Sequence, residues 1–91
     1  MKITWTNEAT RDLGRIRRFL AGVNPRAARH TFETLRYAPR KLLDYPRLGV
    51  RLEHFPDRTI RRMVVGDYEI RYELKTDSIV ILRVWHGKED R

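Results

Sequence analysis

The order of apolar and polar residues divides the chain into a helical first half and a stranded second half. Apolar residues recur at steps of three and four between residues 9 and 42, which is the spacing of one helix face. From residue 59 onward they alternate with polar residues or run on without a break, as in β-strands. The pattern predicts an α+β fold whose helices and strands lie in separate parts of the sequence.

A short β-type run, residues 2–6, precedes the first predicted helix. Thr6 or Asn7 can cap this helix, because either side chain accepts a hydrogen bond from a first-turn amide. Its apolar stripe consists of Ala9, Leu13, Ile16 and Leu20. Gly22 is expected to end it.

A second helix is predicted after a short turn, with Asn24 as its cap and Pro25 in its first position. Its stripe consists of Ala28, Phe32, Leu35 and Leu42. Pro39 removes a helical hydrogen bond, so the helix should kink or its first segment should end near Tyr37. Because the turn is short, the two helices should form an antiparallel hairpin.

Three further strands are predicted at residues 59–65, 68–74 and 78–86. Gly66 and Asp67 form a two-residue hairpin turn between the first two. The last strand is apolar on both faces, so it should lie centrally in the sheet. The three strands form an antiparallel meander in one sheet with the N-terminal strand. The order is β-α-α-β-β-β, in a single domain of residues 1–91.

Charge is the compositional feature that indicates a partner. The chain has 20 Lys and Arg residues against 12 Asp and Glu, a formal net charge of +8. Residues 1–52 carry twelve basic and four acidic side chains, whereas residues 53–91 carry eight of each. The excess charge therefore lies in the helical half, where it would attract a polyanion or an acidic protein.

Several classes of protein are excluded by composition. The chain has no cysteine, and its three histidines lack metal-ligand spacing, so we expect no metal and no cofactor. No apolar run approaches the roughly 18 residues that a membrane span requires, and the N-terminus lacks the plan of a secretion signal. We expect a cytoplasmic protein that does not bind membranes.

Five motifs, in order and spacing, cover almost the whole chain. They are Ala9 with Leu13 after the first strand, Asn24-Pro25 with Ala27-Ala28, Tyr45-Pro46 with Leu48-Gly49, Gly66-Asp67-Tyr68 with Ile70 and Tyr72, and Leu82-Arg83-Val84-Trp85-His86. The chain resembles the RelE/ParE superfamily of bacterial type II toxin–antitoxin toxins. The resemblance implies a growth-inhibiting toxin, associated with plasmid stabilisation, that a cognate antitoxin neutralises in a hetero-oligomer.

The superfamily implies two alternative targets. ParE-like members are implied to poison DNA gyrase without nuclease chemistry, whereas RelE-like members are implied to cleave mRNA in the ribosome. Residues 46–49 and the long helical hairpin look more like ParE, which favours gyrase. The basic charge and His86 suit the nuclease branch equally well, so the sequence leaves open whether the protein is an enzyme.

Metal-free RNA cleavage requires a base, an acid and cations for the phosphate. His86 is the candidate acid or base, and Arg62 and Arg83 are the candidate phosphate clamps. Glu53 is a weaker candidate base, because it lies in a predicted loop. His86 resembles the catalytic histidine of some ribosome-dependent members by its place at the end of the last strand. Those members carry tyrosine next, where this chain has Gly87.

Strand alternation separates two of these candidates. On a flat strand His86 shares a face with Val80, Leu82 and Val84, and Arg83 shares the other with Ile79, Ile81 and Trp85. Arg83 and His86 should then face opposite ways, unless the strand twists or bulges near Val84. A site shared by Arg62 and His86 remains open.

The partner-binding candidates are Arg15, Arg18 and Arg29 on the helices and Trp85 on the last strand. We favour binding over a plain solvated face for the arginines, because a net +8 in one half exceeds what solubility requires. For Trp85, packing in the core or hairpin is favoured over a role as a base-stacking platform. An extended, partly acidic antitoxin segment would cover the helical hairpin and an edge of the sheet.

Overall fold

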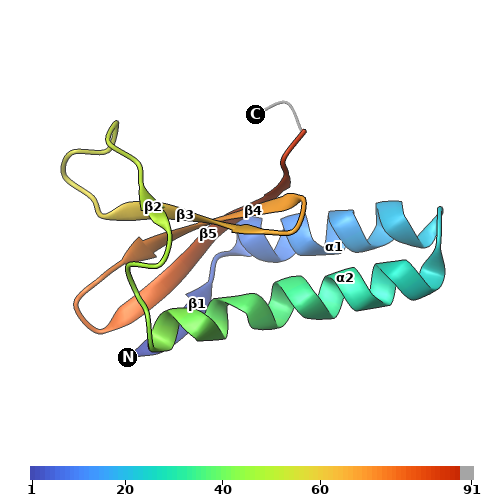
Figure 1. Ribbon diagram of the computed structural model, residues 1–91, viewed down its shortest axis with the longest axis horizontal. Coiled ribbons are helices and arrows are strands. Elements are labelled where there is room, and N and C mark those ends of the chain that lie inside the picture. The colour runs from blue at the N-terminus through green and yellow to red at the C-terminus, as the bar shows by residue number, and fades with distance from the viewer. Residues whose placement is uncertain (89–91) are drawn as a thin grey trace.

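The computed structural model describes residues 1–88 and places a five-stranded sheet against a two-helix hairpin (Figure 1). The elements are β1 (Lys2–Trp5), α1 (Asn7–Ala21), α2 (Pro25–Tyr37), the 3-10 helix η1 (Ala38–Leu43), β2 (Val50–Arg51), β3 (Ile60–Val65), β4 (Tyr68–Leu74) and β5 (Ser78–His86). The predicted α+β class and element order are confirmed. The addition is β2, whose two residues are too few to leave a pattern of alternation.

The helix ends form as the sequence predicts. The Thr6 hydroxyl accepts a hydrogen bond from the Ala9 amide at 3.0 Å and caps α1. The Asn24 side chain caps α2 in the same way, with Pro25 in the first position. The α-helix ends at Tyr37, and the chain continues as η1, because Pro39 cannot supply the next helical N–H.

The strand order is β1-β5-β4-β3-β2, with β1 parallel to β5 and the other pairs antiparallel. The central strand is therefore β4, and the prediction for β5 holds only for its first half. Residues 78–81 of β5 lie between β1 and β4, but β1 ends at Trp5. Beyond Ile81, α1 lies along the open edge of β5 in place of a strand.

The core lies between the helices and the sheet face that they cover. The helices contribute Ala9, Leu13, Ile16, Leu35 and Leu42. The strands contribute Met63, Ile70, Tyr72, Ile79, Ile81 and Val84. Burying each large apolar side chain contributes about 1.5–3 kcal/mol. The far end of the hairpin extends past the β3–β4 turn, where no sheet lies beneath it (Figure 1).

A β-bulge in β5 corrects the predicted faces of this strand. Tyr72 pairs with Ile81 and Arg71 with Arg83, so Leu82 is an extra residue without a partner on β4. The extra residue shifts the alternation, so Val84 joins Ile79 and Ile81 on the helix side. The prediction that Arg83 shares a face with the two isoleucines was therefore wrong, as was the grouping of His86 with Val80 and Leu82. Arg83 and His86 still face opposite ways.

Candidate functional site

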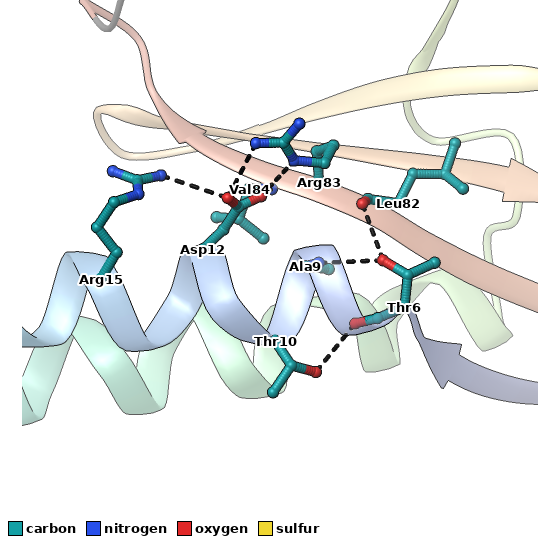
Figure 2. Close-up of polar contacts among 8 residues, drawn as sticks. All are labelled: Thr6, Ala9, Thr10, Asp12, Arg15, Leu82, Arg83 and Val84. Atoms are coloured by element: carbon teal, nitrogen blue, oxygen red, sulfur yellow. Dashed lines mark hydrogen bonds and ion pairs between the residues drawn. The ribbon is translucent and has the colours of Figure 1, made fainter.

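The Asp12 carboxylate connects α1 to the end of β5 (Figure 2). Its Oδ2 atom accepts hydrogen bonds from Arg83 Nε at 2.7 Å and from the Val84 amide at 2.9 Å. Its Oδ1 atom accepts from Arg83 Nη2 at 3.1 Å and lies 3.5 Å from Arg15 Nη2. Nearby, the Thr6 hydroxyl donates to the Leu82 carbonyl at 3.0 Å. Beyond the end of β1, side chains of α1 and its cap thus form hydrogen bonds with backbone groups on the open edge of β5.

The environment of Asp12 keeps it ionised. Burial raises the pKa of this carboxyl, since the residue is only 4% exposed. The hydrogen bonds from Arg83 and Val84 and the positive charge of Arg83 outweigh burial, so the pKa lies below its ordinary value. Arg83 is consequently held in an ion pair.

One face of the sheet points away from the helices, and the other arginines on that side also have carboxylate partners. Glu69 lies 3.5 Å from Arg62 and 3.4 Å from Arg71, and Glu73 lies 2.7 Å from Arg58. Both glutamates are buried. The hydrogen bond from Arg58 lowers the pKa of Glu73, despite burial. This face therefore carries paired charges.

Trp85 lies on the same face and is buried, but outside the helix-side core. The guanidinium carbons of Arg71 and Arg83 lie 4.7 and 4.9 Å from its ring centroid. Such cation–π contacts hold both arginines over the indole. Trp85 thus packs beneath arginines, which the sequence did not predict.

His86 lies apart from Arg83. Its ring makes an edge contact with Tyr68 at 5.2 Å, and its Nδ1 atom accepts a hydrogen bond from the Lys88 amide at 3.1 Å. His86 and Arg62 line one hollow of about 360 Å³. Of the three predicted catalytic residues, the structure brings these two together and places Arg83 against Asp12 instead. Glu53 is exposed between β2 and β3.

Sequence reasoning missed how the loop before β2 is held. The Tyr72 hydroxyl donates to the Pro46 carbonyl at 2.8 Å and accepts from the Gly49 amide at 2.9 Å. Burial raises the pKa of Tyr72, so the hydroxyl keeps the proton that it donates. Arg61 Nη1 donates to the Gly49 carbonyl at 2.6 Å. Alternation predicted that Tyr72 is buried, but the partner of a buried hydroxyl leaves no signal in the sequence.

The loop forms one wall of an apolar groove of about 680 Å³. The other walls come from α2, η1 and β3, with Tyr37, Lys41, Leu48, Val50 and Val64 among the lining residues. Leu48, Val50 and Val64 are 49%, 63% and 69% exposed. Because β2 pairs only with Arg61 and Arg62, residues 63–65 of β3 have no outer strand neighbour in the described chain. This groove (the β3 groove) combines an open strand edge with exposed apolar side chains.

The predicted partner-binding arginines lie on the hairpin and are exposed. Arg15 contacts Asp12, whereas Arg18 and Arg29 form no ion pair within residues 1–88. In the same range, no cluster of three His, Cys, Asp or Glu side chains is suited to a metal ion. No described helix is long and apolar enough to span a membrane.

The family model described as ParE toxin of the type II toxin–antitoxin system parDE matches residues 3–91. The chain belongs to this family. It is 31% identical over 87 residues to Toxin RelE2 of Caulobacter vibrioides, covering 94% of each chain. A chain of the chromosomal ParDE TA system from P. aeruginosa has the same fold, with a TM-score of 0.80 at 21% identity, over 94% of this chain and 95% of that one. The predicted RelE/ParE superfamily is confirmed, and the protein is a type II toxin whose family implies an antitoxin partner.

Proposed function

We propose that this toxin arrests growth by poisoning DNA gyrase and that a cognate antitoxin neutralises it. The pairing of the sheet arginines is the observation that carries the proposal. RNA cleavage without a metal requires cations that can meet the phosphate. Arg62 and Arg83 instead contact Glu69 and Asp12, both 4% exposed. A phosphate brought to this face would meet buried negative charge as well as arginine.

The hydrogen bond that His86 accepts also favours gyrase poisoning over RNA cleavage. An imidazole whose Nδ1 accepts a bond from the Lys88 amide carries its proton on Nε2 when neutral. To act as a base at Nε2 it would have to move that proton to Nδ1 and lose the bond. His86 is therefore better suited to fixing the end of β5 than to proton transfer.

A RelE-like, ribosome-dependent endoribonuclease is the second candidate. The hollow that Arg62 and His86 share favours it, because an acid–base group and a cation there border a space of about 360 Å³. Lys88 lines the same hollow and adds a second positive charge.

One paired assay tests both candidates. Purified toxin is added to gyrase in a supercoiling reaction and, separately, to ribosomes programmed with mRNA. We expect loss of supercoiling and intact mRNA. His86→Ala should remain as toxic as the control His30→Ala, which changes an exposed histidine on α2. If mRNA is cut and His86→Ala lowers cleavage by the 10²–10⁴-fold typical of acid–base groups, the nuclease candidate is correct.

For neutralisation, we propose that an extended antitoxin segment occupies the β3 groove. Residues 63–65 offer an open strand edge to which another strand can add, and exposed Leu48, Val50 and Val64 offer apolar contacts. Val64→Asp should weaken antitoxin binding by at least about tenfold, since it places a charge in an apolar interface. An unchanged affinity would exclude this groove as the antitoxin site.

A further inference from the structure

The distal part of the helical hairpin has an unusual charge distribution. Residues 13–32 contain five arginines and no aspartate or glutamate. The part formed by residues 15–29 (the hairpin end) includes all five: Arg15, Arg17, Arg18, Arg26 and Arg29. No acidic side chain within the stretch balances this charge, and Arg15 reaches Asp12, which lies outside it.

The charges of the hairpin end also differ from those of the sheet in their contacts. Arg58, Arg62, Arg71 and Arg83 all contact carboxylates. Within residues 1–88, Arg18, Arg26 and Arg29 form no ion pair. Four arginines of the sheet and its adjoining loop are thus paired with carboxylates, whereas Arg18, Arg26 and Arg29 of the hairpin end have no carboxylate partner in the described chain.

Two apolar side chains lie among these arginines. Val23 is 74% exposed and Phe19 is 72% exposed, the highest values for large apolar residues in the described chain. Arg17 is held over the ring of Phe32 at 5.0 Å. The hairpin extends past the sheet (Figure 1), and the exposure of the two side chains shows that the described chain leaves them uncovered. Exposed aromatic groups flanked by arginine are typical of the residues that dominate protein interfaces.

We infer that the hairpin end is the surface with which the toxin engages its target, an acidic protein surface with an apolar recess for Phe19 and Val23. The inference rests on the proposed function in taking that target to be gyrase. A protein fits better than nucleic acid, since phosphate contacts require only the cations and leave Phe19 and Val23 unexplained. The β3 groove begins at Thr34, about 8 Å along α2 from Arg29 at 1.5 Å per residue. The residues that we assign to the target and to the antitoxin thus do not overlap.

Two variants test the hairpin end, Phe19→Ser and the double variant Arg18→Ala/Arg29→Ala. All three residues are exposed and none belongs to the core, so the fold should persist. The matched controls are Val64→Ser, an exposed apolar residue of the β3 groove, and Arg51→Ala/Lys75→Ala, two exposed cations away from the hairpin. Each protein is assayed for growth arrest on induction, inhibition of gyrase supercoiling, and affinity for the antitoxin.

Both hairpin variants should lose growth arrest and gyrase inhibition by at least about tenfold, the effect of removing a dominant interface residue. Their antitoxin affinity should stay within about twofold of wild type. Val64→Ser should show the reverse, with weaker antitoxin binding and full arrest. Arg51→Ala/Lys75→Ala should match the wild type throughout.

The outcomes separate the inference from the proposed function. If wild-type toxin leaves gyrase active but the hairpin variants lose growth arrest, gyrase is not the target and the hairpin end still is the contact surface. If the variants inhibit gyrase as wild type does, the inference is wrong and the gyrase proposal stands. If wild type binds a 20-base-pair DNA duplex and only the arginine variant weakens growth arrest, the hairpin end binds nucleic acid and the inference is wrong. A wild-type chain that does not arrest growth overturns both.

Discussion

Asp12 Oδ2 lies 2.7 Å from Arg83 Nε, joining two residues that are 71 positions apart in the chain. The same carboxylate oxygen accepts the Val84 amide proton, so one side chain both pairs with an arginine and completes the edge of a strand. This contact fixes α1 against β5. It also holds the Arg83 side chain in an ion pair.

Asp12→Ala should destabilise the fold by about 1–3 kcal/mol, mainly because it leaves the buried Val84 amide without an acceptor. Arg83, whose side chain is 41% exposed, can be hydrated instead. Urea denaturation measures the loss. Asp12→Asn should lose less stability, since its amide oxygen can still accept from Val84. Glu33→Ala, at an exposed position of α2, is the neutral control. Equal stability of Asp12→Ala and wild type would contradict the assigned role.

The free energy of unfolding should fall in acid, because the ion pairs of Asp12 and Glu73 are lost when these carboxylates are protonated. The pKa values of Asp12 and Glu73 lie below their ordinary values of 3.8 and 4.5 in the folded chain. Because protons bind more readily to the unfolded chain, the stabilisation is fully present above these values and is lost as pH falls through the lower folded values. Thermal unfolding should give a constant midpoint from pH 7 to about 5 and a decrease below about 4.5. A double variant, Asp12→Asn/Glu73→Gln, should show a flatter decrease; an identical slope would exclude these two groups as its source.

Tyr72→Phe should loosen the loop before β2. The substitution removes the acceptor of the Gly49 amide and the donor to the Pro46 carbonyl, at a cost of about 1–3 kcal/mol. Hydrogen exchange of residues 46–49 should accelerate, and antitoxin affinity should fall with the loss of an ordered groove wall. Tyr45→Phe, at an exposed position, is the control. Unchanged exchange in Tyr72→Phe would show that Arg61 alone holds the loop.

Gly49→Ala should be the more damaging loop variant. A Cβ atom there would overlap the Arg62 carbonyl oxygen and lie 2.9 Å from Tyr72 Cε1, so backbone on β3 would have to move. We expect a loss of about 3 kcal/mol or more, measured by denaturation. Gly14→Ala is the matched control, because its Cβ meets only a flexible arginine at 3.4 Å and helix propensity favours alanine by about 1 kcal/mol. Wild-type stability of Gly49→Ala would show that the close approach at Gly49 is unimportant.

What the sequence predicted was local. The caps at Thr6 and Asn24, the helix end before Pro39 and the turn at Gly66 each depend on one or two neighbouring residues, and all four agree with the structure. The sequence left a bulge near Val84 open, but its position at Leu82 could not be predicted, because an extra residue looks like any other in a continuous apolar strand. The roles of the candidate site residues were harder to predict than the fold. Whether Arg83 is a phosphate clamp or an ion-pair partner depends on Asp12, and nothing in the spacing of the two residues reveals their contact.

The pairing of β1 with β5 determines when the folded toxin can form. Ile3 lies opposite Ile79 in the parallel pair, so β1 can pair in the sheet only after β5 is available. Contacts so distant in sequence form slowly and late in folding. During synthesis the chain must therefore emerge from the ribosome as far as β5 before the fold can close. The contact surfaces of the folded toxin therefore exist only after β5 has been made.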